Sequence, residues 1–268
     1  MKKKMFRVCI ELTNHKWSSA LLKRFAMSKI SRPFNPLFVK TYQVNMDESA
    51  RSLDSFDNLH TLFTRKLKVE SRPIAPGDRT VVAPVDGQCS EHGILVEGQK
   101  FLVKGQSYLL HEMLQSKEEA KKFENGYYMV FYLSPAHYHR IHSPFNAICK
   151  SVKTAGNKSY PVNHLGLTYG KKPLSHNYRQ ITKLEMLSGI CTMIEVGAMN
   201  INSIVRIKTD KKWLKGEETG YFSFGSTVVL LFEQGSFQPT LNVDEVKMGE
   251  KIGEMVDEKV KNACGTFP

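Results

Sequence analysis

The feature that most constrains the fold is a series of short apolar runs, separated by turn-forming residues, that begins at Thr80. Runs of roughly four to eight residues rich in Val, Ile, Tyr and Phe and bounded by Gly, Pro, Asn or Asp are typical of β-strands. We therefore predict a mainly β domain over this part of the chain. The runs lie in TVVAPVDG (80–87), QKFLVKG (99–105), GYYMVFYL (126–133), CTMIEVGAMNINSIVRI (191–207) and GYFSFGSTVVLLFE (220–233).

Before this series, the apolar residues follow a helical spacing. They form two adjacent rows, Trp17, Leu21 and Phe25 in the first and Leu22, Ala26 and Ile30 in the second. On a helix these rows make one apolar face with basic residues beside it. A second helix is predicted where Phe56, Leu59, Phe63 and Leu67 repeat, with Ser55 as its N-cap.

The change of pattern sets the predicted domain organisation. SRPIAPGD (71–78), with two prolines and a glycine, marks a boundary. We predict an α+β protein with a helical N-terminal module over residues 1–70 and a β-rich catalytic domain over 71–268. One further helix is expected around Leu109–Leu114, before the polar run 116–122.

Positive charge is concentrated in the N-terminal module. The chain of 268 residues has a formal net charge of +12, and its first 40 residues hold ten Lys or Arg against the single acid Glu11. A basic amphipathic helix with a Trp favours binding to an anionic membrane surface. The alternative is a helix that packs on its own core. Nucleic acid is excluded as a partner because no zinc finger, RNP-like aromatic strand or helix-turn-helix spacing is present.

Three observations bear on the compartment. No apolar run approaches the ~18–20 residues needed to cross a bilayer. Arg7 and Glu11 interrupt the apolar part of the N-terminus, which argues against a cleaved signal peptide. The five cysteines (Cys9, Cys89, Cys149, Cys191 and Cys264) have no CxxC spacing, which indicates reduced thiols inside a cell.

Reactive side chains occur at three places in the β part. Asp86 lies in an Asp-Gly pair, which by itself is typical of a turn. His137, His139 and His142 lie within six residues directly after an apolar run, and imidazole is the side chain best suited to move protons near pH 7. A zinc site is disfavoured because no cysteine nearby completes a ligand set.

The third place is Gly225-Ser226, just before the run VVLLF. A turn explains the pair without chemistry. A serine directly after a glycine can also attack the preceding carbonyl through a five-membered ring and convert the amide into an ester. That reaction needs a base for the hydroxyl and donors for the oxyanion. A triad in the order Asp86, His142, Ser226 would supply the base.

Together these segments resemble the phosphatidylserine decarboxylase family over nearly the whole chain. The resemblance rests on the order and separation of the Asp86-Gly pair, YHRIH and Gly225-Ser226, together with the N-terminal pattern. The similar segments are LHTLFTRKL (59–67), SRPI (71–74), VAPVDG (82–87), FYLSPAHYHRIHSP (131–144), PVN (161–163), NYR (177–179), VGAMN (196–200) and FGST (224–227). Departures such as Asn202 and Phe224 leave Asp86, His142, Gly225 and Ser226 untouched.

The resemblance implies a proenzyme that cleaves itself between Gly225 and Ser226 into a β chain, 1–225, and an α chain, 226–268. His142, oriented by Asp86, is expected to deprotonate Ser226, which becomes a covalent pyruvoyl cofactor. This ketone would bind the substrate amine and accept the electrons released as CO2 leaves phosphatidylserine, giving phosphatidylethanolamine. His139 is expected to assist decarboxylation, and no metal is expected.

The resemblance also gives the N-terminal module a role. We expect the module to hold the enzyme, as a peripheral protein, on the cytoplasmic face of a bacterial cell membrane, with phosphatidylserine and the anionic surface as partners. The cleaved chains would stay together as a heterodimer, and a homo-oligomer is left open.

Two other functions are compatible with parts of the pattern. A serine hydrolase would use the same order of Asp, His and Ser, but it would require a sharp turn such as GxSxG at the nucleophile. VVAPVDG (81–87) and VKMGEKIGEM (246–255) loosely resemble halves of a biotinyl or lipoyl carrier domain, without the modified Lys. This likeness favours a barrel-sandwich-like β core and carries no functional prediction.

Overall fold

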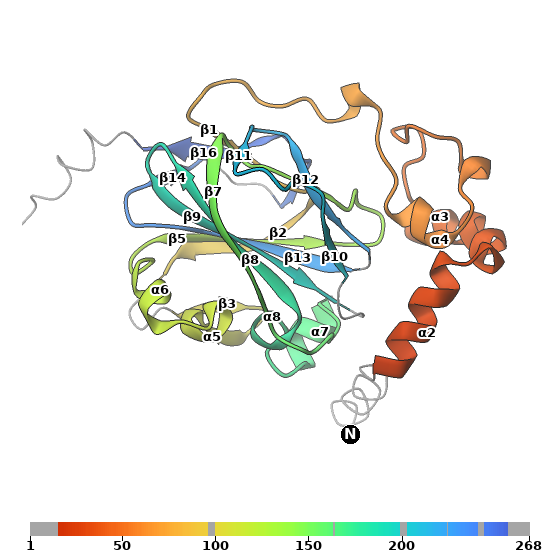
Figure 1. Ribbon diagram of the computed structural model, residues 1–268, viewed down its shortest axis with the longest axis horizontal. Coiled ribbons are helices and arrows are strands. Elements are labelled where there is room, and N and C mark those ends of the chain that lie inside the picture. Colours follow the sequence, from red (N-terminus) through yellow and green to blue (C-terminus); the bar gives the residue numbers. More distant parts are fainter. Residues whose placement is uncertain are drawn as a thin grey trace, which may run out of the picture.

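Strands dominate the chain from Thr80 onward, as predicted, in a computed structural model that describes residues 16–95, 100–162, 164–198, 203–223, 225–240 and 244–256 (Figure 1). The cations before Lys16, Cys9, Cys264, and the side chain of Trp17 lie outside this description.

The largest sheet has eight antiparallel strands in the order β11-β7-β8-β9-β13-β5-β2-β15. These are β2 (Gly87–Ile94), β5 (Tyr127–Leu133), β7 (Ala147–Ala155), β8 (Arg179–Met186), β9 (Gly189–Gly197), β11 (Lys212–Trp213), β13 (Ser226–Phe232) and β15 (Glu245–Val246). Three smaller sheets are β1-β16-β14, β10-β12-β6 and β3-β4. Their strands are β1 (Thr80–Val82), β3 (Lys100–Val103), β4 (Gln106–Leu109), β6 (Arg140–His142), β10 (Ile204–Arg206), β12 (Glu218–Phe222), β14 (Phe237–Pro239) and β16 (Lys251–Met255).

Strand β13 lies in the interior of the large sheet and is buried along its whole length. Its seven residues pair with β5 on one side and β9 on the other. Val228, Leu230 and Phe232 enter one hydrophobic core, while Val229 and Leu231 enter a second core on the opposite face. Because both faces are covered, β13 is a continuous apolar run instead of an alternating one.

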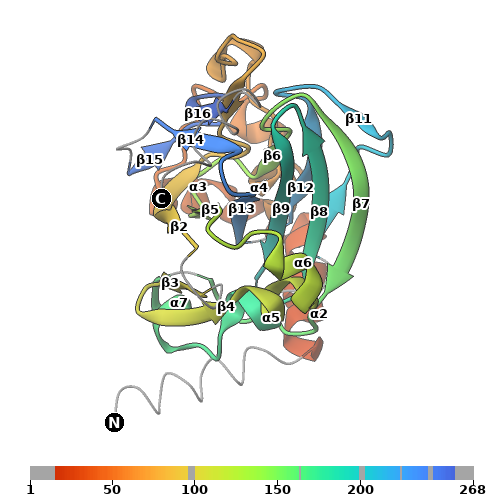
Figure 2. The same cartoon turned by 90° about the vertical axis from the view of Figure 1, so that its left-hand side faces the viewer.

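The two cores have different covers. One contains residues of the small sheets, such as Phe222, Phe237 and Ile252. The other contains residues of short helices, such as Leu110, Met113 and Leu167. Figure 2 shows these helices below the sheet. They are α5 (Leu110–Leu114), α6 (Lys117–Lys121), α7 (His164–Tyr169) and α8 (Pro173–His176).

A group of helices precedes the first strand and lies beside the β part (Figure 1). It comprises α2 (Lys16–Met27), η1 (Lys29–Phe34), α3 (Asn35–Tyr42), η2 (Leu53–Ser55), α4 (Leu59–Phe63) and η3 (Val69–Ser71). The helical character of this part is as predicted, while its separation at residue 70 as a domain stays a prediction. None of the described helices is both long and apolar enough to span a bilayer.

Three details differ from the sequence expectations. The N-cap of α4 is Asn58, whose side chain accepts the Thr61 N–H at 2.9 Å in a capping box, whereas Ser55 ends η2. The run 220–233 is two strands, β12 and β13, in different sheets. The core is mainly β, but the strands described do not close into a barrel, since β11 and β15 are the two edges of the large sheet.

Candidate active site

The Gly225–Ser226 bond lies where the chain passes from β12 in a small sheet to β13 in the large one. Ser226 is the first residue of β13 and is opposite Leu133 of β5 and Gly197 of β9. Its side chain is fully buried, and Oγ has no hydrogen-bond partner among the described residues. A buried hydroxyl normally finds a partner, so an unbonded one is a candidate reactive group.

The carbonyl that precedes Ser226 is held by a backbone donor. The Ala198 N–H donates to the Gly225 oxygen at 2.9 Å, directly beyond the end of β9. A fixed N–H aimed at a carbonyl oxygen stabilises the negative charge that develops there during nucleophilic attack. Gly225 also faces open space, since a Cβ added there would meet no atom within 4 Å.

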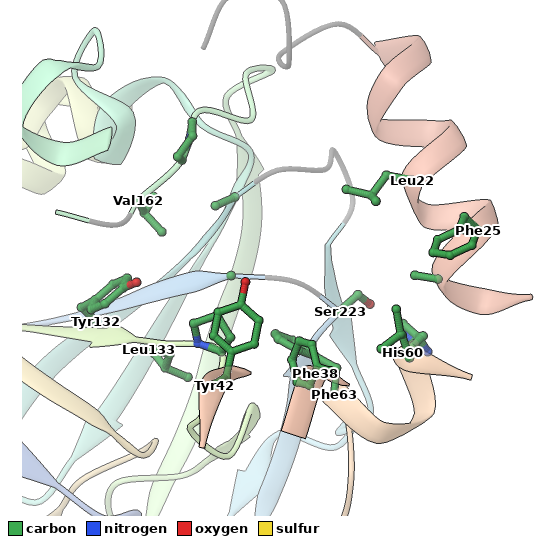
Figure 3. Close-up of a pocket in the computed structure, with 16 residues that line it drawn as sticks. Leu22, Phe25, Phe38, Tyr42, His60, Phe63, Tyr132, Leu133, Val162 and Ser223 are labelled. Atoms are coloured by element: carbon green, nitrogen blue, oxygen red, sulfur yellow. The ribbon is translucent and has the colours of Figure 1, made fainter. Parts of the chain in front are cut away.

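That open space is a cavity of about 580 Å³ between the N-terminal helices and the β part. Leu22 and Phe25 of α2 approach it from one side and Tyr132 and Leu133 of β5 from another (Figure 3). The remaining wall is mostly apolar, with Ala26, Phe38, Tyr42, Leu59, His60, Phe63, Pro135, Pro161, Val162, Ala198, Ser223 and Gly225. The bond proposed for cleavage therefore borders a cavity with largely apolar walls.

His139 lies beside this cavity. Its ring packs against Phe63 of the cavity wall at 3.9 Å between centroids, and its backbone oxygen accepts the Phe222 N–H at 2.9 Å. Nδ1 lies 2.9 Å from the His137 carbonyl oxygen, so Nδ1–H must donate and Nε2 carries the lone pair. Nε2 is buried without a partner among the described residues.

The environment keeps His139 neutral. Burial lowers its pKa to about 3, and the nearby charge of Arg65 lowers it as well. An uncharged imidazole with a free lone pair can accept a proton but has none to give from Nε2. In the described state His139 can therefore accept a proton at Nε2, and its lowered pKa makes it a weak base.

His142 is held differently. Nδ1–H donates to the Gly216 oxygen at 2.8 Å, and Nε2 lies 3.2 Å from the Tyr138 hydroxyl oxygen. In its sheet His142 pairs with Glu218, the first residue of β12, which is the end of that strand more distant in sequence from Ser226. Burial lowers the pKa of His142. Both ring nitrogens are thus occupied.

Asp86 is paired with Arg72. The guanidinium donates Nε–H to Asp86 Oδ1 at 2.8 Å and Nη2–H to Oδ2, and the Met248 N–H donates to Oδ1 at 2.9 Å. Arg72 also bonds Glu48 at 2.9 Å. Burial alone would lower the pKa of Arg72, but its hydrogen bonds to Asp86 and Glu48 raise it.

The structure thus places Gly225 on the cavity wall, with Ser226 next to it in the chain and His139 packed against the wall residue Phe63. It places His142 and Asp86 in adjoining networks. No hydrogen bond joins Asp86 to His142, or His142 to Ser226, among the described residues. His137 is a loop residue whose Nε2 lies 3.1 Å from Glu245 Oε1. Within the described part of the chain, no group of three potential ligands is placed to hold a metal ion.

Sequence reasoning missed Ala198, Arg72 and Tyr138 as members of the site. Ala198 acts through its backbone N–H, which leaves no side-chain signature. Arg72 and Tyr138 do lie within the segments SRPI and YHRIH noted for the resemblance. Their contacts with Asp86 and His142 come from the fold.

Comparison with known proteins agrees with the family resemblance noted in the sequence. A family model described as "Phosphatidylserine decarboxylase" matches residues 59–254. A protein of Halalkalibacterium halodurans, named phosphatidylserine decarboxylase proenzyme, is 49% identical over 94% of this chain and 98% of its own length. Proteins of the same name from Bacillus subtilis and Geobacillus kaustophilus are 46% identical over 93% of this chain and 96% of their length, and 44% identical over 94% and 97%.

Proposed function

This chain belongs to the phosphatidylserine decarboxylase family, and we propose that it cleaves itself between Gly225 and Ser226 and decarboxylates phosphatidylserine at the group formed from Ser226. The enzyme is a lyase that makes phosphatidylethanolamine, and its relatives are named as proenzymes. The assignment of individual residues below is our proposal.

One observation carries the proposal: the Gly225 carbonyl is polarised by the Ala198 N–H, while Ser226 Oγ is buried and unbonded. Oγ would lose its proton to a base and bond to the Gly225 carbonyl carbon, with the oxyanion held by Ala198. The C–N bond to Ser226 would then break, and the nitrogen would take a proton to become a free amine. A base would then remove the Ser226 α-proton as the Cβ–Oγ bond of the ester breaks, which releases the Gly225 carboxylate and leaves dehydroalanine at residue 226. Dehydroalanine would tautomerise to an imine, and water would hydrolyse the imine to the ketone and ammonia.

Two histidines are candidates for the base that deprotonates Ser226. The order of residues assigns it to His142 with Asp86, and we keep that assignment. It requires Nε2 of His142 to exchange the Tyr138 hydroxyl for the serine, and Asp86 to be released from Arg72. His139 is the alternative, because its Nε2 is free and its backbone bonds Phe222 next to the cleavage segment.

The residues present fit a pyruvoyl group formed from Ser226. Ser226 has a buried hydroxyl that nothing else uses, and Gly225 leaves space on the cavity side. Such a group supplies a ketone that accepts the electrons left behind as CO2 departs. The chain's own contribution is to hold residue 226 between β5 and β9 and to surround it with apolar walls, which exclude water and favour loss of a carboxylate charge.

We also propose that the N-terminal helices bind a membrane surface. Leu21 and Ile30 are 69% and 73% exposed, and Met27, Phe34 and Leu37 are about half exposed. The cations Arg24, Lys29 and Arg32 are nearby in sequence, while Ala26 and Phe25 of the same helix face the cavity. We call the exposed set Leu21, Met27, Ile30, Phe34 and Leu37 the apolar surface. Insertion of this surface would bring a lipid to the cavity.

Intact mass spectrometry tests the processing chemistry. The purified enzyme is expected to contain chains of 225 and 43 residues, the shorter without a free α-amino group. The Ser226→Ala variant is expected to stay a single chain of 268 residues without activity and with unchanged melting, because the lost hydroxyl makes no hydrogen bond to the residues that the structure describes. Full activity in a single intact wild-type chain would exclude this mechanism.

A further inference from the structure

His60 is a polar side chain on the cavity wall that the proposed chemistry does not use. The wall carries polar groups from Tyr42, His60, Tyr132 and Ser223, and the rest of it is apolar apart from backbone atoms. Of the wall residues described, His60 is the one whose side chain can take a positive charge. It belongs to α4 and is half-buried, with its ring 6.5 Å from that of Tyr221 in an edge-on arrangement.

A second cation lies close to His60. Lys23 of α2 is half-buried, unlike its exposed neighbour Arg24, and it follows the wall residue Leu22. Burial lowers the pKa of His60, and the charge of Lys23 lowers it further. Neither the His60 ring nor the Lys23 ammonium has a hydrogen-bond or ion-pair partner among the described residues. Two groups that repel as cations, without a carboxylate between them, favour an anion as the missing partner.

The two sides of the cavity suit the two ends of a phospholipid. Leu22, Phe25, Phe38 and Leu59 supply apolar walls from the helices, and Ser223 and Gly225 mark the other side, at the cleavage site. A phosphodiester is the anion that joins the acyl part of a phospholipid to its head group, so it must lie between these two sides. His60 borders the same cavity, can donate a hydrogen bond, and can gain the matching positive charge when an anion binds.

We propose that His60, assisted by Lys23, binds the phosphodiester of the phospholipid substrate and thereby sets how far the head group reaches toward residue 226. This rests on the proposed function. His60 is a binding residue that acts on the substrate's anion, and it takes no part in cleavage of the Gly225–Ser226 bond.

Proton linkage gives the site a distinctive signature. In the empty cavity His60 is neutral near pH 7, because its pKa lies below the usual value. A bound phosphodiester would raise that pKa, so binding takes up a proton and tightens as pH falls between the two values, by at most about tenfold per pH unit. The other groups around His60 are Lys23, Tyr42, Tyr132, Tyr221 and Arg140, which lies over the Tyr221 ring. None of these has an ordinary pKa between 5 and 8.

The test uses short-chain, water-soluble phosphatidylserine, which removes membrane binding from the measurement. His60→Gln, His60→Ala and Lys23→Ala are compared with His176→Ala and Lys121→Ala, which remove one histidine and one lysine outside the cavity wall. We expect His60→Ala to raise KM roughly 10- to 100-fold, as for loss of a hydrogen bond to a charged group, and His60→Gln, whose neutral amide can still donate, to raise it less. We expect kcat to change little, chain cleavage to be complete, and the pH dependence of KM between pH 5.5 and 7.5 to flatten.

A second arm identifies the anion and separates the two proposals. Short-chain phosphatidylethanolamine has the phosphodiester without the carboxylate, and its dissociation constant is measured with the uncleaved Ser226→Ala protein with and without His60→Gln. An equal loss of affinity for both lipids supports the phosphodiester. A loss for phosphatidylserine alone, or no loss for either, overturns the proposal. An uncleaved wild-type chain would instead contradict the proposed function and leave this binding measurement intact.

Discussion

Strand β13, which begins with Ser226, and the N-terminal helices differ in how far their apolar side chains are buried. Strand β13 is paired on both sides along seven residues and buried in two cores, so the position of Ser226 is fixed by the strands around it. The helices α2 to α4 keep large apolar side chains in solvent. They are linked to the β part by hydrogen bonds such as Arg140 to the Thr64 oxygen and Arg65 to the Ala136 oxygen. The proposed chemistry, which needs fixed geometry, lies in the first region, and the surface proposed to bind a membrane lies in the second.

The largest expected effect concerns chain cleavage and separates the two regions. His142→Ala should leave an uncleaved, inactive chain, because the base for Ser226 is lost, whereas His139→Ala should cleave and then decarboxylate poorly. Exposed positions such as Leu37 should have no influence on cleavage. Time courses of cleavage, followed by intact mass in refolded or cell-free synthesised protein, measure each variant. Blocked cleavage in His139→Ala, with normal cleavage in His142→Ala, would assign the base to His139.

A second prediction sharpens the comparison through stability. Leu230 is fully buried in β13, and Leu37 of α3 is 58% exposed. In the Ser226→Ala single chain, Leu230→Ala should lower the free energy of unfolding by about 2–5 kcal/mol, since it leaves a cavity. Leu37→Ala should change it by less than about 0.5 kcal/mol. Urea denaturation of both variants measures the difference, and equal effects would contradict the division.

The contrast also explains what could be predicted from the sequence. Gly225-Ser226 and the histidine segment were predicted as a site because serine and histidine side chains are suited to such chemistry and because their order and separation resemble those of a known family, and their roles stay a prediction. Ala198 was missed because a backbone donor is invisible until β9 and the cleavage segment meet. Asp86 was expected to orient His142, but its carboxylate accepts hydrogen bonds from Arg72, because pairing partners depend on which loops the fold brings together.

Local signals had limits of the same kind. Ser55 and Asn58 are both good N-caps by type. The structure places the cap at Asn58, where Thr61 completes a reciprocal pair of hydrogen bonds. The run 220–233 has strand composition throughout, and nothing local says that β12 and β13 join different sheets. The two helical rows of apolar residues likewise do not distinguish Ala26, which is buried, from Leu21 and Ile30, which are exposed.

A third prediction uses pH. His139 has a folded pKa of about 3 against an unfolded value near 6.5, so the unfolded chain binds the extra proton between these values. Its contribution to stability is complete above pH 6.5 and is lost as pH falls, at up to about 1.4 kcal/mol per pH unit. His139→Gln in the Ser226→Ala chain should reduce the slope of unfolding free energy between pH 6.5 and 4.5. Some slope should remain, because burial also lowers the pKa of His142 and His60. An unchanged slope would mean that His139 takes up a proton in the fold as readily as in the unfolded chain, and would contradict the lowered pKa.

The smallest expected effect lies at the apolar surface. Leu21 and Leu187 are equally exposed, at 69%, but Leu187 lies in the turn between β8 and β9, away from the N-terminal helices. Leu21→Ser combined with Ile30→Ser should weaken binding to anionic phospholipid vesicles several-fold or more, since burial of an aliphatic side chain contributes about 1.5–3 kcal/mol. Leu187→Ser should bind vesicles as the wild type does. Co-sedimentation at low and physiological salt measures both, and salt should weaken binding if the cations of α2 and η1 contribute. Equal losses in the two variants would contradict membrane contact through the N-terminal helices. Membrane binding would then no longer explain why apolar side chains are exposed there.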